Sequence, residues 1–243
     1  MKIIPPIDAK AEQIAALARG VVQAVPLAGG LLAESIDLWA NPIEKRKVRW
    51  IRDVSESINK ICDELGMLPS TLAEDDRFIS FLMQATLVAL RNHQDEKLLA
   101  LKFALTSSTD ASRFSEDESF IFLRYVDELT PTHLLLLSEL GKHVEKLNNL
   151  STIDEIYSLV ITVAPNIERF VFRLCLRDLA SRSLIVFDDL DDFPEYVTKR
   201  QFYVTSSSGK RPLTLTESGL KFLEFVVLGS GRTNLPVRVG DAG

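Results

Sequence analysis

Three arginines recur at four-residue intervals in the segment Ile167–Arg182, whose sequence is IERFVFRLCLRDLASR. Positions i, i+4 and i+8 of an α-helix lie on one face. The spacing therefore predicts a cationic edge formed by Arg169, Arg173 and Arg177. Guanidinium groups that stay open on this edge would indicate a phosphate-bearing partner, whereas groups paired with neighbouring carboxylates would indicate a structural role. This edge is the sharpest candidate binding surface in the sequence.

Residue types that serve catalysis are present, but not at catalytic spacings. A phosphate-binding loop needs a glycine five residues before its Gly-Lys pair and a hydroxyl residue after it. Here Val204 precedes Gly209-Lys210 and Arg211 follows it. The sequence also has no Gly-x-Ser-x-Gly elbow, the turn that presents a nucleophilic serine in many hydrolases.

Metal ligation has equally little support in the sequence. The histidines, His93, His133 and His143, are scattered and have no partner at metal-ligand spacing. We expect His133 and His143 to lie on helix surfaces or to cap carbonyl groups. The acidic cluster Asp188, Asp189, Asp191 and Asp192 lacks the glycine and distal glutamate of a calcium loop, which predicts solvated loop charge. The sequence thus predicts a protein that is not an enzyme and that holds no cofactor or metal.

Length and charge limit the classes of protein to which this chain can belong. A chain of 243 residues with 46% apolar residues is long enough for two domains of ordinary size, and two are expected. The net charge of −6 disfavours nucleic-acid binding by the whole surface, so any basic site must be a patch. Cys62 and Cys175 both fall in helical patterns and are expected to be buried, reduced thiols. The first residues do not resemble a secretory leader, which favours a cytoplasmic location.

The first predicted domain, residues 1–129, is a helical bundle. Its apolar residues recur with a helical period in six segments, and the second of these is expected to end before Pro42. The fourth is expected to begin with Ser70 or Thr71 as its N-cap. The predicted helices are Ile7–Ala24, Leu31–Trp39, Ile43–Leu65, Ser70–Arg91, Asp95–Ser108 and Phe120–Leu129.

Two features of this domain leave alternatives open. The segment Gly20–Ala33 carries no charge but is shorter than the roughly twenty apolar residues that span a bilayer; it is either a buried helical hairpin or a segment that inserts into membrane interfaces. Cations also alternate with aromatic rings at the start of the third helix. Those residues either contact a membrane or partner, or form a solvated helix face. They are Trp39, Lys45, Arg46, Arg49 and Trp50.

The Thr130-Pro131 junction is the predicted domain boundary, because threonine suits an N-cap and proline suits the first helical turn. Three helices are expected to follow: His133–Leu147, a helix capped by Ser151 or Thr152, and the arginine-bearing helix capped by Asn166. From Leu184 the apolar period changes to that of strands, and SSSGKRP indicates a turn. Thr216 is expected to cap a last helix, and residues 229–243 a flexible tail.

The C-terminal segments LASRSLIVFDD and LTLTESGLKFLEFV, with a Gly-Lys-Arg turn between them, resemble the end of a bacterial winged-helix domain, here residues 130–228. The resemblance implies a two-stranded wing and a third helix that enters the DNA major groove. It nominates Arg169, Arg173, Arg177, Lys210 and Arg211 for nucleic-acid or partner binding. The pattern departs from DNA-binding relatives, because the third helix has no Ser, Thr, Asn or Gln between Arg169 and Ala180 to contact base edges.

The sequence therefore predicts a mainly α protein with an N-terminal bundle and a C-terminal winged-helix-like domain with a small β-wing. The expected function is that of a non-enzymatic intracellular regulatory protein that binds a protein partner or a second copy of itself. One alternative is a DNA-binding transcription regulator. Another is a membrane-active effector of a bacterial defence or self-killing system, acting by peripheral membrane contact without a transmembrane segment.

Overall fold

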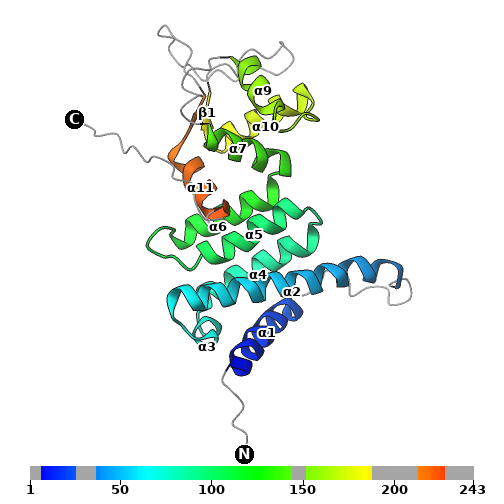
Figure 1. Cartoon of the computed structure of the whole chain (residues 1–243), viewed down its shortest axis with the longest axis vertical. Helices are drawn as coiled ribbons and strands as arrows, with labels where there is room; N and C mark the ends of the chain where they lie inside the picture. Colours follow the sequence, from blue (N-terminus) through cyan, green and yellow to red (C-terminus); the bar gives the residue numbers. More distant parts are fainter. Residues whose placement is uncertain (1–6, 26–36, 144–151, 188–212, 228–243) are drawn as a thin grey trace, which may run out of the picture. The chain divides into compact units, whose positions relative to one another are not determined.

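The computed structural model describes residues 7–25, 37–143, 152–187 and 213–227. Within these residues the chain is mainly helical, with one two-stranded sheet, so the predicted mainly α fold with a small β element is confirmed. The chain divides into two compact units (Figure 1). Unit 1 comprises Met1–Glu128 and Phe225–Gly231, and unit 2 comprises Leu129–Glu224 and Arg232–Gly243.

Unit 1 is a helical bundle in which α4 contacts every other helix of the bundle. One face of α4 carries the apolar side chains Phe78, Phe81, Leu82 and Ala85, all of them buried. These residues follow the helical period of the sequence, so one amphipathic segment supplies the centre of the core. The helices are α1 (Ile7–Ala24), α2 (Asp37–Leu65), α3 (Pro69–Ala73), α4 (Asp76–Arg91), α5 (Asp95–Ser107) and α6 (Glu116–Glu128).

Three helix boundaries in unit 1 were predicted wrongly, and one of them is the start of α6, which lies at Glu116 and not at Phe120. Pro42 lies inside α2 and does not separate two helices. Proline in the second turn of a helix removes one backbone hydrogen bond and crowds the preceding turn, but the longer run of turns after Pro42 continues the helix. The segment Ser70–Arg91 forms two helices, because the Asp75 carboxylate accepts hydrogen bonds from the backbone N–H groups of Arg77 and Phe78 and so begins a new helix.

Unit 2 consists of α7 (Pro131–Lys142), α9 (Ile153–Ile161), α10 (Arg169–Ser181), β1 (Ile185–Val186), β2 (Thr214–Leu215) and the first part of α11 (Glu217–Val227). The two short strands are antiparallel and pair Ile185 with Leu215. Helix α10 contacts α7, α9 and β1, so it is the central element of the described part of this unit. The predicted N-caps Thr130, Thr152 and Thr216 all stand at helix starts, and Thr216 Oγ1 accepts from the Gly219 N–H.

Candidate functional site

Helix α10 buries one face completely. Phe172, Cys175, Leu176 and Leu179 follow the i, i+3, i+4, i+7 spacing of a helix face, and all four are buried. The Tyr157 ring on α9 meets the Phe172 ring edge-on, with 5.2 Å between centroids. This packing fixes how α10 is rotated about its axis. Every other residue of the helix must then lie at its sides or face away from the core.

The chain takes up left-handed backbone geometry just beyond the C-cap of α10. Ser183 has a φ of 58°, and the N–H groups of Ser183 and Leu184 donate to the carbonyl groups of Ala180 and Leu179. This arrangement satisfies carbonyls that a helix end leaves without partners. Asn166, the predicted N-cap, is not the cap, because Glu168 stands at that position. The Glu168 side chain makes no capping hydrogen bond, so α10 is positioned mainly by its buried face.

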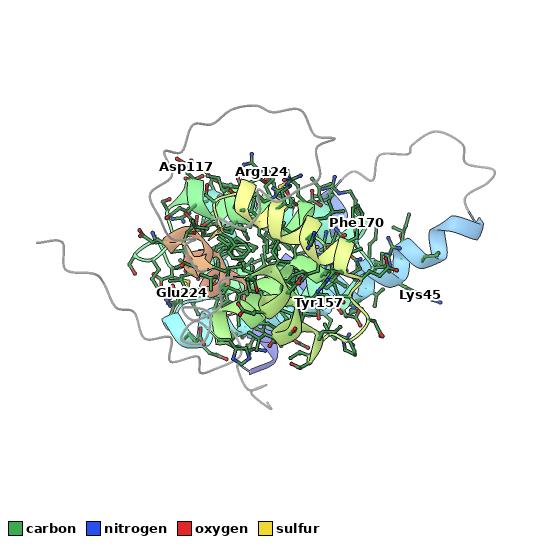
Figure 2. All side chains as sticks on the ribbon, turned by 90° about the horizontal axis from the view of Figure 1, so that it is seen from above. Lys45, Asp117, Arg124, Tyr157, Phe170 and Glu224 are labelled. Atoms are coloured by element: carbon green, nitrogen blue, oxygen red, sulfur yellow. The ribbon has the colours of Figure 1, made fainter. Side chains whose placement is uncertain are left out.

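The outward side of α10 is apolar. Phe170, Leu174 and Val171 are 65%, 43% and 38% exposed. Phe170 and Leu174 are four residues apart, which places them about 40° apart around the helix axis. We call Phe170, Val171 and Leu174, with the neighbouring Arg173 and Arg177, the α10 face. Figure 2 labels Phe170 on this helix.

The three arginines of the predicted edge lie in different environments. Arg169 Nη2 pairs with Asp154 Oδ1 at 2.9 Å, and its guanidinium carbon lies 5.3 Å from the centre of the Tyr157 ring. Arg173 and Arg177 are half-buried. The Nε atom of Arg173 is buried, and no acceptor within the part of the chain that the structure describes satisfies it. Arg169 thus has a structural partner, while Arg173 keeps an unsatisfied donor.

A chain of polar contacts holds α10 against α7. His133 Nδ1 accepts from the Thr130 N–H at 3.2 Å, so the neutral ring carries its proton on Nε2. Nε2 lies 3.3 Å from Asp178 Oδ2 on α10, and the other Asp178 oxygen accepts from Arg182 Nε. The prediction that His133 lies on a helix surface or caps a carbonyl is wrong, because the side chain is buried and accepts a backbone N–H.

The predicted basic and aromatic cluster on α2 is mostly engaged within unit 1. Trp50 belongs to the core: it is 1% exposed and its Nε1 donates to Thr86 Oγ1 at 2.9 Å. Arg46 donates to the Leu90 carbonyl, and Arg49 pairs with Asp95 at 2.6 Å. Trp50 is therefore not an interface aromatic in this structure, and neither arginine is an open cation.

Other predicted contact residues are differently placed. Lys45 is exposed near the start of α2, where Figure 2 labels it. The side chain of Trp39 and all of Lys210 and Arg211 lie outside what the structure describes. Phe170 and Leu174 were not among the contact residues predicted from the sequence, although both are exposed. A signal was present, since α10 has more apolar residues than a single buried face can hold.

The described residues contain no group of three side chains that could hold a metal ion. No helix among them is both long and apolar enough to cross a bilayer.

No protein-family model matches the chain, and neither curated proteins nor solved structures include a significant match to it. The function of this chain must therefore be inferred from the geometry of the α10 face.

Proposed function

We propose that this chain is a non-enzymatic regulatory protein that binds a protein partner through the α10 face. The observation that carries the proposal is the exposure of Phe170 beside Leu174 on a helix whose other face already fills the core. Folding does not require an aromatic ring at a solvent position. Burying such a side chain against a partner contributes about 1.5–3 kcal/mol, and aromatic residues with arginine are the types that dominate protein interfaces.

A winged-helix-like arrangement of unit 2 remains part of this proposal. Its support is the order of helix, helix, strand, antiparallel strand and helix from α9 to α11. In this arrangement α10 corresponds to the helix that DNA-binding winged helices insert into the major groove. Many residues of such a helix would have to contact base edges or phosphates.

The α10 face suits a protein better than it suits DNA. Base edges are recognised mainly by bidentate arginine, asparagine or glutamine side chains, whereas Phe170, Val171 and Leu174 occupy the outward positions. Arg169, which would be a phosphate contact, is paired with Asp154. A protein partner with an apolar surface can bury these apolar side chains without any rearrangement, whereas bound DNA would leave most of their area exposed.

A selection from random peptides tests the proposal without knowledge of the natural partner. The purified full chain is immobilised, and peptides are retained only if they bind wild type and not the Phe170→Ser variant. We expect such peptides to be found. Leu99→Ser is the matched control, because Leu99 is a similarly exposed apolar residue, 52% exposed, on α5 of unit 1. This control should bind the selected peptides as wild type does.

Two other measurements complete the test. Thermal unfolding should be the same for wild type and Phe170→Ser, because the ring is exposed. A gel-shift assay with mixed-sequence duplex DNA over a salt series should show no binding that depends on Arg173. The proposal is refuted if no peptide distinguishes wild type from Phe170→Ser, or if wild type binds DNA tightly and Arg173→Glu abolishes the binding.

A further inference from the structure

We infer that the α10 face recognises an acidic amphipathic helix, a segment with apolar residues on one side and Asp or Glu beside them. This inference rests on the proposed function, since it specifies the chemistry of the protein partner. It follows from the charge beside the apolar strip, from the unsatisfied donor of Arg173, and from the spacing of the exposed side chains.

The charge of α10 is opposite to that of the chain as a whole. Residues 167–182 contain four arginines against one glutamate and one aspartate, in a protein whose net charge is −6. Arg169, Arg173 and Arg177 follow one edge of the helix over a rise of about 12 Å. Arg169 is paired with Asp154, so the border of the apolar strip depends on Arg173, whose Nε has no acceptor among the described residues. A partner with carboxylates beside its own apolar residues is complementary to this border, and a basic partner is repelled.

Arg173 supplies a separate argument for a carboxylate. Its Nε atom is buried without an acceptor among the described residues, and a buried donor left unsatisfied destabilises the conformation that holds it. Rotation of this half-buried side chain onto a partner carboxylate replaces the unsatisfied donor with a charge-assisted hydrogen bond. An acidic segment thus satisfies the buried Arg173 donor when it binds, whereas an apolar side chain of a neutral partner cannot accept that hydrogen bond.

The spacing favours a helical partner. Phe170 and Leu174 are separated by one helical turn, so they form ridges about 6 Å apart along the axis. A partner helix with apolar residues at i and i+4 has grooves at the same interval. An acidic residue that flanks these apolar positions one turn away then lies beside Arg173.

A second copy of the chain does not meet these requirements. In a symmetric dimer formed through the α10 face, the same helix packs against itself around a two-fold axis. Arg173 lies between the apolar residues in sequence, so two symmetry-related Arg173 side chains would approach each other near that axis. The resulting like-charge contact disfavours self-association relative to an acidic partner.

Two designed peptides test the inference. Both have about eighteen residues, long enough for measurable helix formation, with the same leucines at i, i+4 and i+7 spacing. One has glutamate and the other lysine at the flanking positions. Fluorescence anisotropy with the full chain should show binding of the glutamate peptide and little binding of the lysine peptide. A glutamate peptide with a central proline, which breaks the helix, should also bind poorly.

Variants of the protein separate the parts of the site. Arg173→Glu should lower the affinity for the glutamate peptide by about tenfold or more and raise the affinity for the lysine peptide. The reason is that the substitution replaces a positive charge beside the apolar strip with a negative one. Phe170→Ser should abolish binding of the glutamate peptide, and Leu99→Ser should leave it unchanged. Increasing salt should weaken binding to wild type more than to Arg173→Gln, since screening acts on the charge pairs.

The outcomes distinguish this inference from the proposed function. The acidic partner is refuted if the glutamate and lysine peptides bind with equal affinity, or if Arg173→Glu changes the affinity for neither peptide. The helical partner is refuted if the proline-containing peptide binds as tightly as the glutamate peptide without proline. If peptides selected from the random library depend on Phe170 but carry no excess of acidic residues, this inference fails while the proposed function stands. Concentration-dependent dimerisation that Phe170→Ser abolishes would replace the acidic partner with a second copy.

Discussion

Trp50 and Thr86 form a buried polar pair in the core of unit 1, with the indole Nε1 donating to Thr86 Oγ1 at 2.9 Å. Thr86 in turn donates its hydroxyl proton to the Leu82 carbonyl at 2.7 Å. Thr86→Val keeps the shape of the side chain but leaves the indole N–H without an acceptor. We expect it to lower the free energy of unfolding by about 1–3 kcal/mol, as measured by urea denaturation.

A double-mutant cycle supplies the control for this prediction. Trp50→Phe removes the donor, so adding Thr86→Val to that variant should cost less than it does in wild type. Thr71→Val, at an exposed hydroxyl, should have little effect. Equal effects of Thr86→Val in the presence and absence of the indole would contradict the hydrogen bond as the cause.

Cys175 lies in the core of unit 2, where burial, and then the nearby negative charge of Asp178, raise the pKa of its thiol to about 11. At about pH 8 this lowers the thiolate fraction roughly a hundredfold relative to an ordinary cysteine. In the Cys62→Ala variant, a disulfide reagent should therefore react with native protein at least that much more slowly than with urea-unfolded protein. The absorbance of the released thiol measures both rates.

The same raised pKa has a consequence for stability. The unfolded chain loses the Cys175 proton near the ordinary pKa of 9.0, before the folded chain does at about 11. The contribution of this thiol to stability is thus complete below about pH 9 and is lost as the pH rises toward 11. Cys175→Ala should show a smaller fall in the free energy of unfolding over this interval than wild type. Parallel curves for the two proteins would show that the thiol does not titrate as stated.

At the scale of helices and strands, local chemistry allowed several elements to be predicted. The apolar period of Ile7–Ala24 gave the bounds of α1, and Thr130, Thr152 and Thr216 marked helix starts, because a capping hydroxyl acts within its own turn. The prediction that a helix ends before Pro42 was wrong, because whether a helix continues through proline depends on the turns on both sides of it.

The candidate site was predictable only in part for a related reason. The four-residue spacing placed Arg169, Arg173 and Arg177 on one edge of a helix. The rotation of that helix against its neighbours was not predictable, because α10 carries apolar residues around most of its circumference. The contact between Phe172 and Tyr157 decides it, and it joins residues on different helices. The excess of apolar residues indicates that some of them are exposed, but only that tertiary contact decides that Phe170 is one of them.

Three helical glycines differ in how closely other elements approach them. A Cβ atom on Gly219 would lie 2.0 Å from the backbone oxygen of Leu184, whereas one on Gly141 would lie 2.7 Å from Leu223 Cδ1, the end of a flexible side chain. Nothing lies within 4 Å of the corresponding position on Gly20. Glycine at these positions therefore has a packing role only where a neighbouring element is close.

Replacement by alanine should destabilise the protein more, the closer the nearest atom lies to the added Cβ. Gly219→Ala should destabilise the protein the most, at or above the upper end of the roughly 1–3 kcal/mol typical of overpacking, because a backbone atom must move. Gly141→Ala should cost less, since Leu223 can adopt another rotamer. Gly20→Ala should raise stability by up to about 1 kcal/mol through helix propensity. Urea unfolding midpoints measure the order, and a tolerated Gly219→Ala would contradict the close approach of α11 to Leu184.

At the scale of the whole chain, unit 1 is not a continuous stretch of sequence, because it includes Phe225 from the end of α11. The Phe225 ring lies 5.1 Å from that of Phe114, 5.4 Å from Phe122 and 6.0 Å from Phe81, and its carbonyl accepts a hydrogen bond from Ser107 Oγ at 2.9 Å. More than a hundred residues of sequence separate Phe225 from each of these neighbours, so the hydrophobic period of residues 1–129 gives no sign that the bundle is incomplete.

Phe225→Ala in the full chain should therefore destabilise unit 1 by about 3–5 kcal/mol, the usual cost of truncating a buried phenylalanine. Cys62, buried in α2, reports on this unit. In a Cys175→Ala background, Phe225→Ala should shift the urea midpoint of Cys62 labelling downward, while Phe170→Ala, which truncates an exposed ring of unit 2, should not. A fragment of residues 1–128 should show the same early exposure of Cys62. Labelling that is unchanged in both would mean that the bundle closes without α11, and that the aromatic cluster around Phe225 adds nothing to its stability.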